Sequence, residues 1–333
     1  QSVCLRLIVE REMEIEAFRP REYWTVKAQL ATPRGQTYEA RLTTLAGKKL
    51  ERYDLADATQ AELAVQAVAS RDLTVTSVEA KPASRNPAAP FMTSTLQQEA
   101  SRKFGMGARA TMSAAQRLYE AGHITYMRTD GIDMAPEAVH AARDAIAKFY
   151  GADYVPGSPR MYKNKAKNAQ EAHECIRPTD MVAKPETLKI ADADQRKLYD
   201  LIWKRTIACQ MAAAKLERTT VEIGAADGQV GLRATGQVVL FDGFLKVYEE
   251  GRDDAESDDD RRLPQIMQGE PALLGKASLK PDFAKATDGA AAVDGMARAD
   301  AAILSADESV LALQHFTQPP PRYTEATLVK KME

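Results

Sequence analysis

The stretch GHITYMRTDG, residues 122–131, places three side chains that could do chemistry within five residues. Tyr126 carries a phenol that can act as a nucleophile, Arg128 a guanidinium that can bind two phosphate oxygens at once, and Asp130 a carboxylate. A free tyrosine has a pKa near ~10, so its phenol needs a nearby positive charge to attack at neutral pH. This combination predicts phosphoryl transfer with tyrosine as the nucleophile.

The elements around this stretch would have to present it. Residues 109–121 place apolar side chains at helical spacing, and Gly122 follows where a left-handed helix cap would lie. The next residues prefer extended backbone, in which alternate side chains face opposite ways. We therefore expect Tyr126 and Arg128 to point to one side and Met127 to turn into the core. On spacing alone, a half-buried structural tyrosine beside a surface arginine is the commoner outcome.

Two other local patterns suggest a zinc-protease motif and a phosphate-binding loop, but neither has the spacing that such a motif requires. His173 has acidic neighbours, but a metalloprotease helix needs a second histidine at the fourth position, and none is there. Lys48 follows Gly47 without the earlier glycine that a phosphate-binding P-loop requires. Neither a zinc protease nor an ATP-dependent enzyme is indicated by these residues.

Composition limits the remaining classes. The 333 residues are enough for about two or three compact units. The chain has 45 Lys and Arg residues and 47 Asp and Glu residues, which gives a net charge of −2. Any basic groove for nucleic acid must therefore be local. Three widely spaced cysteines without a CxxC pair predict neither a disulfide framework nor a zinc site, and they fit a reduced, cytoplasmic setting. No run is long enough to cross a bilayer, so we expect no membrane partner.

The apolar periodicity divides the chain into strand-rich and helical stretches. Strands are expected on both sides of a helical stretch that follows a proline-containing linker at 82–90, namely at residues 23–30, 37–45, 73–80, 219–223 and 230–234. Residues 249–262 are expected to form an acidic loop, and residues 276–313 an Ala- and Asp-rich insertion of weak helical order. Thr324 would cap a last helix. The chain begins at Gln1 inside a helical pattern, so we expect an internal piece of a longer protein.

Five ordered motifs resemble those of type IA DNA topoisomerases. They are QSVCLRLIVERE (1–12), FMTSTLQQ (91–98), ITYMRTD (124–130), QEAHECIRP (170–178) and HFTQPPPRYTEA (315–326). Met127 makes the chain more similar to the bacterial topoisomerase I group than to type III relatives, which more often have proline there. The chain departs from the family at Gly131, where serine is usual, and at Cys175, where alanine is common. Neither position carries the expected chemistry.

The resemblance implies an α+β multidomain fold, toroidal, in which β-rich arches carry a helical domain with the active-site tyrosine over a hole large enough for DNA. Two pieces of a helical base domain would lie at residues 1–20 and 315–333. Two parts of the β-rich arch would lie at residues 21–81 and 213–314, and the tyrosine domain at residues 82–212. An N-terminal Toprim domain and a C-terminal part would lie outside the chain.

The resemblance also implies relaxation of negatively supercoiled DNA without ATP. Tyr126 would attack a phosphodiester of single-stranded DNA to give a 5′-phosphotyrosine, and rejoining would follow strand passage. Arg128 would stabilise the transition state, His173 would contact the phosphate or donate a proton, and Arg322 and Thr324 would bind the strand. Mg²⁺ ligands are expected in the missing N-terminal domain. We therefore expect this chain alone to be inactive, and relaxation of supercoiled DNA by the purified chain would contradict that.

The implied protein is a monomer in the cytoplasm, associated with the nucleoid. Two other classes stay open from the residues. One is a single-stranded DNA-binding scaffold without chemistry, which would never form a covalent adduct. The other is a helical, duplex-reading module of the transcription-factor kind, which lacks a basic recognition helix here and would prefer duplex DNA in competition.

Overall fold

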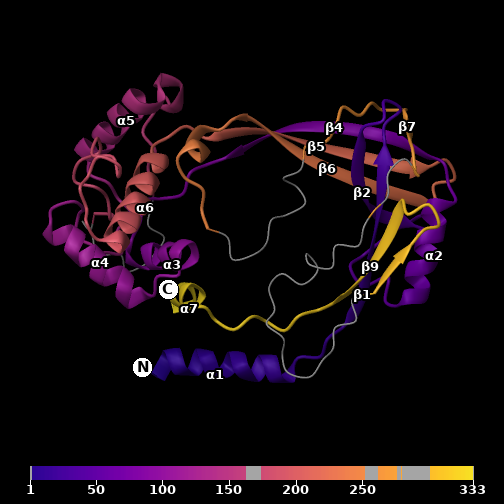
Figure 1. The fold of residues 1–333 in the computed structure, drawn as a ribbon, viewed down its shortest axis with the longest axis horizontal. Coiled ribbons are helices and arrows are strands. Elements are labelled where there is room, and N and C mark those ends of the chain that lie inside the picture. The colour runs from indigo at the N-terminus through magenta and orange to yellow at the C-terminus, as the bar shows by residue number, and fades with distance from the viewer. Residues whose placement is uncertain (1, 163–173, 252–261, 276–278, 280–300, 333) are drawn as a thin grey trace.

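The computed structural model describes residues 2–162, 174–251, 262–275, 279 and 301–332. In these residues the chain forms a mixed α+β fold with an antiparallel sheet at one end and a cluster of helices at the other (Figure 1). The helices are α1 (Ser2–Ala17), α2 (Ala58–Ala69), α3 (Thr93–Phe104), α4 (Ala108–Glu120), α5 (Pro136–Tyr150), α6 (Ala193–Cys209) and α7 (Glu325–Met332), with short 3-10 turns at Ala152–Tyr154 and Gly243–Lys246.

The sheet has the strand order β7-β4-β5-β6-β2-β1-β9-β8, and β3 pairs with β2 beside this path. Its described strands are β1 (Glu22–Ala31), β2 (Thr37–Leu45), β3 (Lys48–Lys49), β4 (Leu73–Arg85), β5 (Ala214–Ala225), β6 (Val230–Phe241), β7 (Pro271–Ala272), β8 (Ala302–Leu304) and β9 (Val310–Phe316). The predicted hairpin of β1 and β2 is confirmed, with Lys27 opposite Arg41 and Ala31 opposite Thr37. The strands therefore come from both sides of the helical stretch, as the alternation predicted.

Two separate hydrophobic cores hold the two ends. One packs α2 against the sheet, where inward residues such as Val26, Leu30 and Leu232 are almost fully buried. The other lies among α3 to α6, around residues such as Leu118 and Ile202. Because each core is built from its own elements, each end satisfies the burial requirement of a compact unit.

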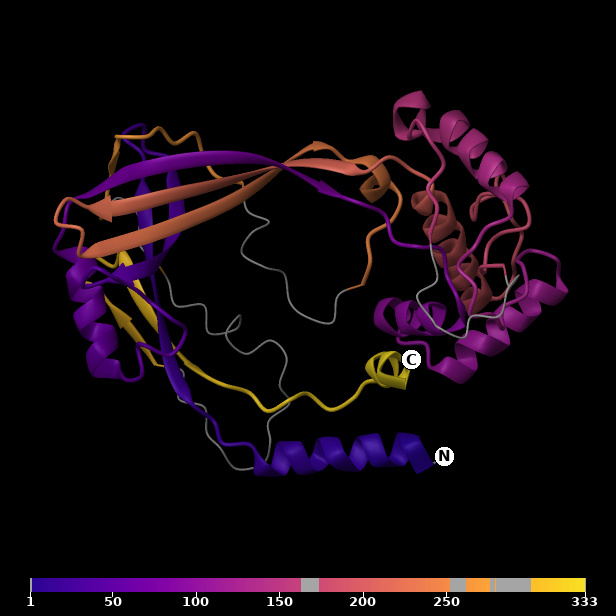
Figure 2. The same cartoon turned by 180° about the vertical axis from the view of Figure 1, so that it is seen from behind.

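A ribbon of three long strands joins the two ends. β4 pairs with β5 from Leu73 opposite Ala225 to Arg85 opposite Ala214, and β6 lies along the other edge of β5. The side chains of β4 are buried only near Leu73 and Val75 and are largely exposed from Glu79 onward. Figures 1 and 2 show the ribbon crossing from the sheet to the helices. The predicted linker is thus shorter, because β4 extends to Arg85.

The chain returns to the helical end along a second route. After β9, residues 317–324 lead in an extended conformation to α7, which packs against α3. In both views α7 lies between α3 and α1 (Figures 1 and 2). The side chain of Arg11 on α1 lies over the ring of Tyr323 at 4.2 Å and donates to the carbonyl of Pro321 at 2.6 Å. These contacts join α1 to the returning segment.

The expectation of a helical insertion over residues 276–313 is wrong for its last third. Residues 302–304 form β8 and residues 310–316 form β9, which pairs with β1 from Glu22 opposite Phe316 to Ala28 opposite Val310. The first residues of β9, Val310 to Ala312, are fully buried. A short apolar run buried on both faces does not alternate, so its periodicity does not distinguish a strand from a helix.

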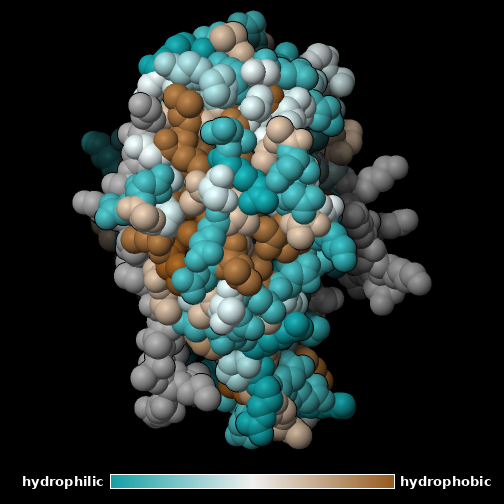
Figure 3. Space-filling model, turned by 90° about the vertical axis from the view of Figure 1, so that its right-hand side faces the viewer, coloured by the Kyte–Doolittle hydropathy of each residue, from teal (hydrophilic) through white to brown (hydrophobic). Residues whose placement is uncertain are grey.

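The described surface carries both polar and apolar residues, and helix α1 exposes several apolar side chains, among them Val3, Leu5 and Met13. On the face at the sheet end, Figure 3 shows apolar residues gathered in patches between polar ones, and Leu63 of α2 is 60% exposed. Of the helices in the described ranges, none combines the length and apolar composition needed to cross a bilayer.

Candidate active site

Helix α4 ends where the sequence predicted and directs the chain into the tyrosine segment. Gly122 has a φ of +76°, in the left-handed region where residues other than glycine are strained. The amide of His123 donates to the carbonyl of Leu118 at 2.9 Å, which closes the last turn. Leu118 and Ala115 are fully buried, so this face of α4 is fixed in the helical core. The start of the tyrosine segment is therefore set by a firmly packed helix.

The tyrosine segment alternates between core and solvent. Ile124 and Met127 are buried at 1% and 0% exposure, whereas Tyr126 is 51% exposed and Arg128 is also exposed. The expectation that Met127 turns inward between two outward side chains is confirmed. The segment is not a regular strand, since it makes one isolated bridge, between Ile124 and Pro178. A phenol and a guanidinium two residues apart thus reach solvent from one loop.

Two threonines hold the backbone of this loop. The hydroxyl of Thr93 donates to the carbonyl of Met127 at 2.8 Å and accepts from the amide of Thr129 at 2.8 Å. The hydroxyl of Thr125 donates to the carbonyl of Cys175 at 2.8 Å and accepts from the amide of Arg177 at 2.9 Å. The two hydroxyls therefore tie the residues on either side of Tyr126 to the first turn of α3 and to residues 175–177. Sequence reasoning missed both roles, because the partners lie 34 or more residues apart.

We expect Thr93→Val to loosen the tyrosine loop. Valine keeps the shape but leaves the amide of Thr129 without its acceptor, which costs about 1–3 kcal/mol for a buried group. Hydrogen exchange of the peptide covering residues 125–131 should accelerate in the variant. Thr93→Ser, which keeps the hydroxyl, should exchange like the unchanged protein, and equal rates in all three would show that the hydroxyl does not hold the loop.

The motif at 170–178 lies beside the tyrosine loop where it is described. Arg177 forms a two-pronged ion pair with Glu174, with nitrogen to oxygen distances of 2.6 and 3.1 Å, and Glu174 also accepts from the amide of Ala135 at 3.0 Å. Ile176 donates its amide to the carbonyl of Phe91 at 2.7 Å. Three of the five motifs therefore meet in space. His173 lies outside the described residues.

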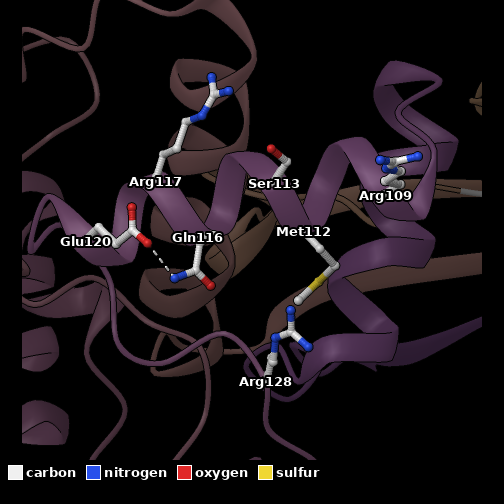
Figure 4. A pocket seen from close by; sticks show the side chains of 7 residues that line it. All are labelled: Arg109, Met112, Ser113, Gln116, Arg117, Glu120 and Arg128. Atoms are coloured by element: carbon white, nitrogen blue, oxygen red, sulfur yellow. Dashed lines mark hydrogen bonds between the residues drawn. The ribbon is translucent and has the colours of Figure 1, made fainter.

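A shallow pocket of about 400 Å³ lies on the exposed face of α4 beside the loop (Figure 4). Its lining residues are Arg109, Met112, Ser113, Gln116, Arg117, Glu120 and Arg128. Arg128 points from its loop toward α4, and Gln116 donates to Glu120 at 2.7 Å. Within the described residues, no hydrogen bond or ion pair engages the guanidinium groups of Arg109, Arg117 or Arg128. This local excess of positive charge, in a chain of net charge −2, suits an anion.

The ring of Tyr126 has one aromatic neighbour that is part of α4. Tyr119 meets it edge to face, with ring centroids 5.3 Å apart and an interplanar angle of 69°. Both rings are partly open to solvent, at 41% for Tyr119 and 51% for Tyr126. Edge-to-face is a favoured arrangement of two aromatic rings, so the contact helps to hold the ring of Tyr126 against α4.

Arg322 and Thr324 lie on the returning segment and not on the tyrosine loop. Arg322 forms a two-pronged pair with Glu12 of α1 at 2.8 and 3.1 Å, and the hydrogen bond from Arg322 lowers the pKa of Glu12. The hydroxyl of Thr324 accepts from the amide of Thr327 at 3.2 Å, which confirms the predicted cap of α7. The structure thus brings Tyr126 and Arg128 together on one loop, and Arg322 and Thr324 together on another segment.

The described residues do not fit a metal centre. Among them no group of three or more His, Cys, Asp or Glu side chains is close enough to share an ion. Cys4, Cys175 and Cys209 are free thiols, and burial raises the pKa of Cys209 to about 12 and also raises the pKa of Cys175. Both buried thiols therefore stay protonated at neutral pH, and thiolate ligation is unfavourable there.

Comparisons with known proteins agree with this arrangement. A family model described as DNA topoisomerase matches residues 1–333. The chain is 51% identical over 338 residues to the DNA topoisomerase 1 of Zymomonas mobilis, which covers 100% of this chain and 25% of that protein. It is 43% identical over 349 residues to the DNA topoisomerase 1 of Xylella fastidiosa, covering 100% of this chain and 38% of that protein.

A solved structure is also similar. Full-length topoisomerase I from Thermotoga maritima superposes with a TM-score of 0.70 at 30% sequence identity, covering 99% of this chain and 46% of that one. The chain spans between 25% and 40% of the length of the first curated relatives that it matches. The resemblance inferred from the five motifs is confirmed: the chain belongs to the type IA, bacterial DNA topoisomerase I family.

Proposed function

We propose that the full-length protein, meaning the longer polypeptide in which we expect this chain to lie, relaxes negatively supercoiled DNA by single-strand breakage and rejoining without ATP. The observation that carries this proposal is the exposed phenol of Tyr126 beside Arg128, whose guanidinium has no ion-pair partner in the described part of the chain. A nucleophile and an unneutralised cation on one rigid loop suit attack on a phosphodiester.

In the proposed reaction the oxygen of Tyr126 attacks a phosphorus of single-stranded DNA and the bond from phosphorus to the 3′ oxygen breaks. The phenol gives up its proton, and the departing 3′ oxygen takes one up to become a hydroxyl. Arg128 is placed to neutralise the charge that gathers on the phosphate oxygens, where a guanidinium acts most strongly. Rejoining is the reverse, so one ester replaces another and no ATP is consumed.

Other residues are assigned by the family resemblance. His173 is proposed to contact the phosphate or to donate a proton, and Arg322 and Thr324 to bind the strand. By the same resemblance, the Mg²⁺ ligands are proposed to lie in an N-terminal domain outside this chain, and no step is derived through the ion. By the same resemblance, the partner is DNA that is single-stranded at the cleavage site, and the protein is a cytoplasmic, nucleoid-associated monomer without a membrane partner.

The proposed architecture is a toroid. Residues 1–20 and 315–333 would belong to a base domain, residues 21–81 and 213–314 to the arches, and residues 82–212 to the tyrosine domain. This division is supported by the separate core of the helical end and by the three-stranded ribbon that joins it to the sheet. It is also supported by the second route, through residues 317–324, back to the helices.

The test uses the full-length protein and a single-stranded oligonucleotide labelled at one end or the other, with denaturation to trap covalent complexes. A 5′-phosphotyrosine requires the 3′-end label to move onto the protein, while the 5′-end label stays on a shorter, free oligonucleotide. Transfer of the 5′-end label would refute the proposed polarity. Binding of the oligonucleotide without any adduct would favour the non-catalytic DNA-binding scaffold.

A further inference from the structure

Glu325, the first residue of α7, caps the N-terminus of α4 with its side chain. The amide of Ala108 donates to the Oε1 atom of Glu325 at 2.7 Å, across 217 residues of sequence. The first amides of a helix have no partner within it, and a carboxylate is the most favourable acceptor because the helix dipole is positive there. Ala326, next to Glu325, is buried at 2% exposure where α7 packs on α3. The carboxylate is thus held at α4 by a packed helix.

Gly107 is fitted to this carboxylate. Its φ of −65° and ψ of 159° are open to any residue, so the backbone does not require glycine. A Cβ atom added at Gly107 would lie 2.8 Å from Oε2 of Glu325, closer than such atoms approach one another. The absence of a Cβ atom at Gly107 therefore leaves the space that the carboxylate of Glu325 occupies. Alanine at this position would push the carboxylate aside without straining the backbone.

The contact joins the two groups of site residues. The far end of α4 leads through Gly122 into the loop of Tyr126, while Glu325 directly follows the segment with Arg322 and Thr324. Helix α7 also packs on α3, which in turn contacts α4, so the bond between Glu325 and Ala108 is part of a larger contact. Separating the two segments must break the bond between Glu325 and Ala108.

We propose that Glu325 is a positioning residue that holds the strand-binding segment against the tyrosine-bearing helices while the DNA ends are joined. The inference rests on the proposed function, in which the ends of a cut strand must part for another strand to pass. In the closed state the carboxylate caps α4 and keeps Tyr126 in register with Arg322 and Thr324. In the open state the cap is lost, and rejoining waits until it forms again.

The experiment measures the equilibrium fraction of denaturation-trapped adduct, and the rate of rejoining, in the full-length protein. Glu325→Ala should raise the trapped fraction and slow rejoining by roughly threefold to tenfold, the range expected when a helix cap is lost. Glu325→Gln keeps an oxygen that accepts from Ala108 and loses only the charge, so its effect should be clearly smaller than that of Glu325→Ala. Damage to the fold would instead lower the adduct and the unfolding temperature together.

Gly107→Ala provides an independent route to the same contact. Alone it should reproduce the Glu325→Ala phenotype, whereas added to Glu325→Ala it should change nothing further, since the displaced group is gone. An unchanged or lower trapped fraction in Glu325→Ala, or equal effects of Gly107→Ala in both backgrounds, would overturn the proposal. Failure of the proposed function itself would show differently, as the absence of any adduct in the unchanged protein.

Discussion

In the full-length protein, Tyr126→Phe is expected to abolish the covalent adduct with single-stranded DNA, a fall of roughly 10⁴-fold or more in the amount trapped by denaturation. Phenylalanine keeps the ring and its edge contact with Tyr119, and it removes only the oxygen that attacks phosphorus. Relaxation of supercoiled DNA should be lost to the same extent. Binding of the oligonucleotide should persist, because the guanidinium groups beside the loop are untouched.

Tyr119→Phe is the matched control for this experiment. It removes a hydroxyl from the ring 5.3 Å away and leaves the nucleophile in place, so adduct formation should continue. An adduct that persists in Tyr126→Phe would move the nucleophile to another residue and end the assignment. Loss of the adduct in both variants would mean that the two rings act together, which the geometry does not require.

Arg128→Ala is expected to slow cleavage by about 10²-fold, the loss seen when one well-placed donor to a transition state is removed. The side chain is exposed and has no ion-pair partner among the described residues, so its removal leaves no buried charge unpaired. Stability should therefore change little, and the effect should fall on the rate of adduct formation at saturating oligonucleotide. Single-turnover cleavage separates this rate from binding.

Arg128→Lys tests whether charge alone is sufficient. Lysine keeps the positive charge but cannot bind two phosphate oxygens in a fixed plane, so its cleavage rate should lie between those of arginine and alanine. If alanine and lysine both cleaved at the unchanged rate, Arg128 would have no part in the reaction. A change confined to the affinity for the oligonucleotide would make it a binding residue only.

Local patterns predicted the parts of the site that depend on near neighbours. The end of α4 at Gly122 needs only the apolar spacing before it and a residue that tolerates a φ of +76°. The burial of Met127 between Tyr126 and Arg128 follows from alternation alone. These features are set within a few residues, which is the range over which periodicity and turn chemistry act.

The contacts that hold the site in place join residues much farther apart in the sequence, so local patterns did not predict them. Thr93 reaches Met127 across 34 residues, and Glu325 reaches Ala108 across 217. Thr93 and Glu325 lie in the motifs at 91–98 and 315–326, but their residue types do not identify their partners, because a threonine or a glutamate on a helix is most often simply solvated. The strand β9 was missed for a related reason, since its partner β1 lies almost 300 residues earlier and its apolar run has no period. Such contacts are fixed by the tertiary fold.

The three-stranded ribbon has a mechanical consequence. Its three strands are paired over most of their length, so sliding them past one another would have to break many backbone hydrogen bonds at once. Its outer half buries few side chains, so flexing it sideways costs little packing. The pairing of β4 with β5 shifts register between Val75 and Ser77, and that of β5 with β6 shifts between Lys215 and Leu216. Such bulges are places where strands bend and twist. We therefore expect the ribbon to be stiff along its strands and to bend more easily perpendicular to them.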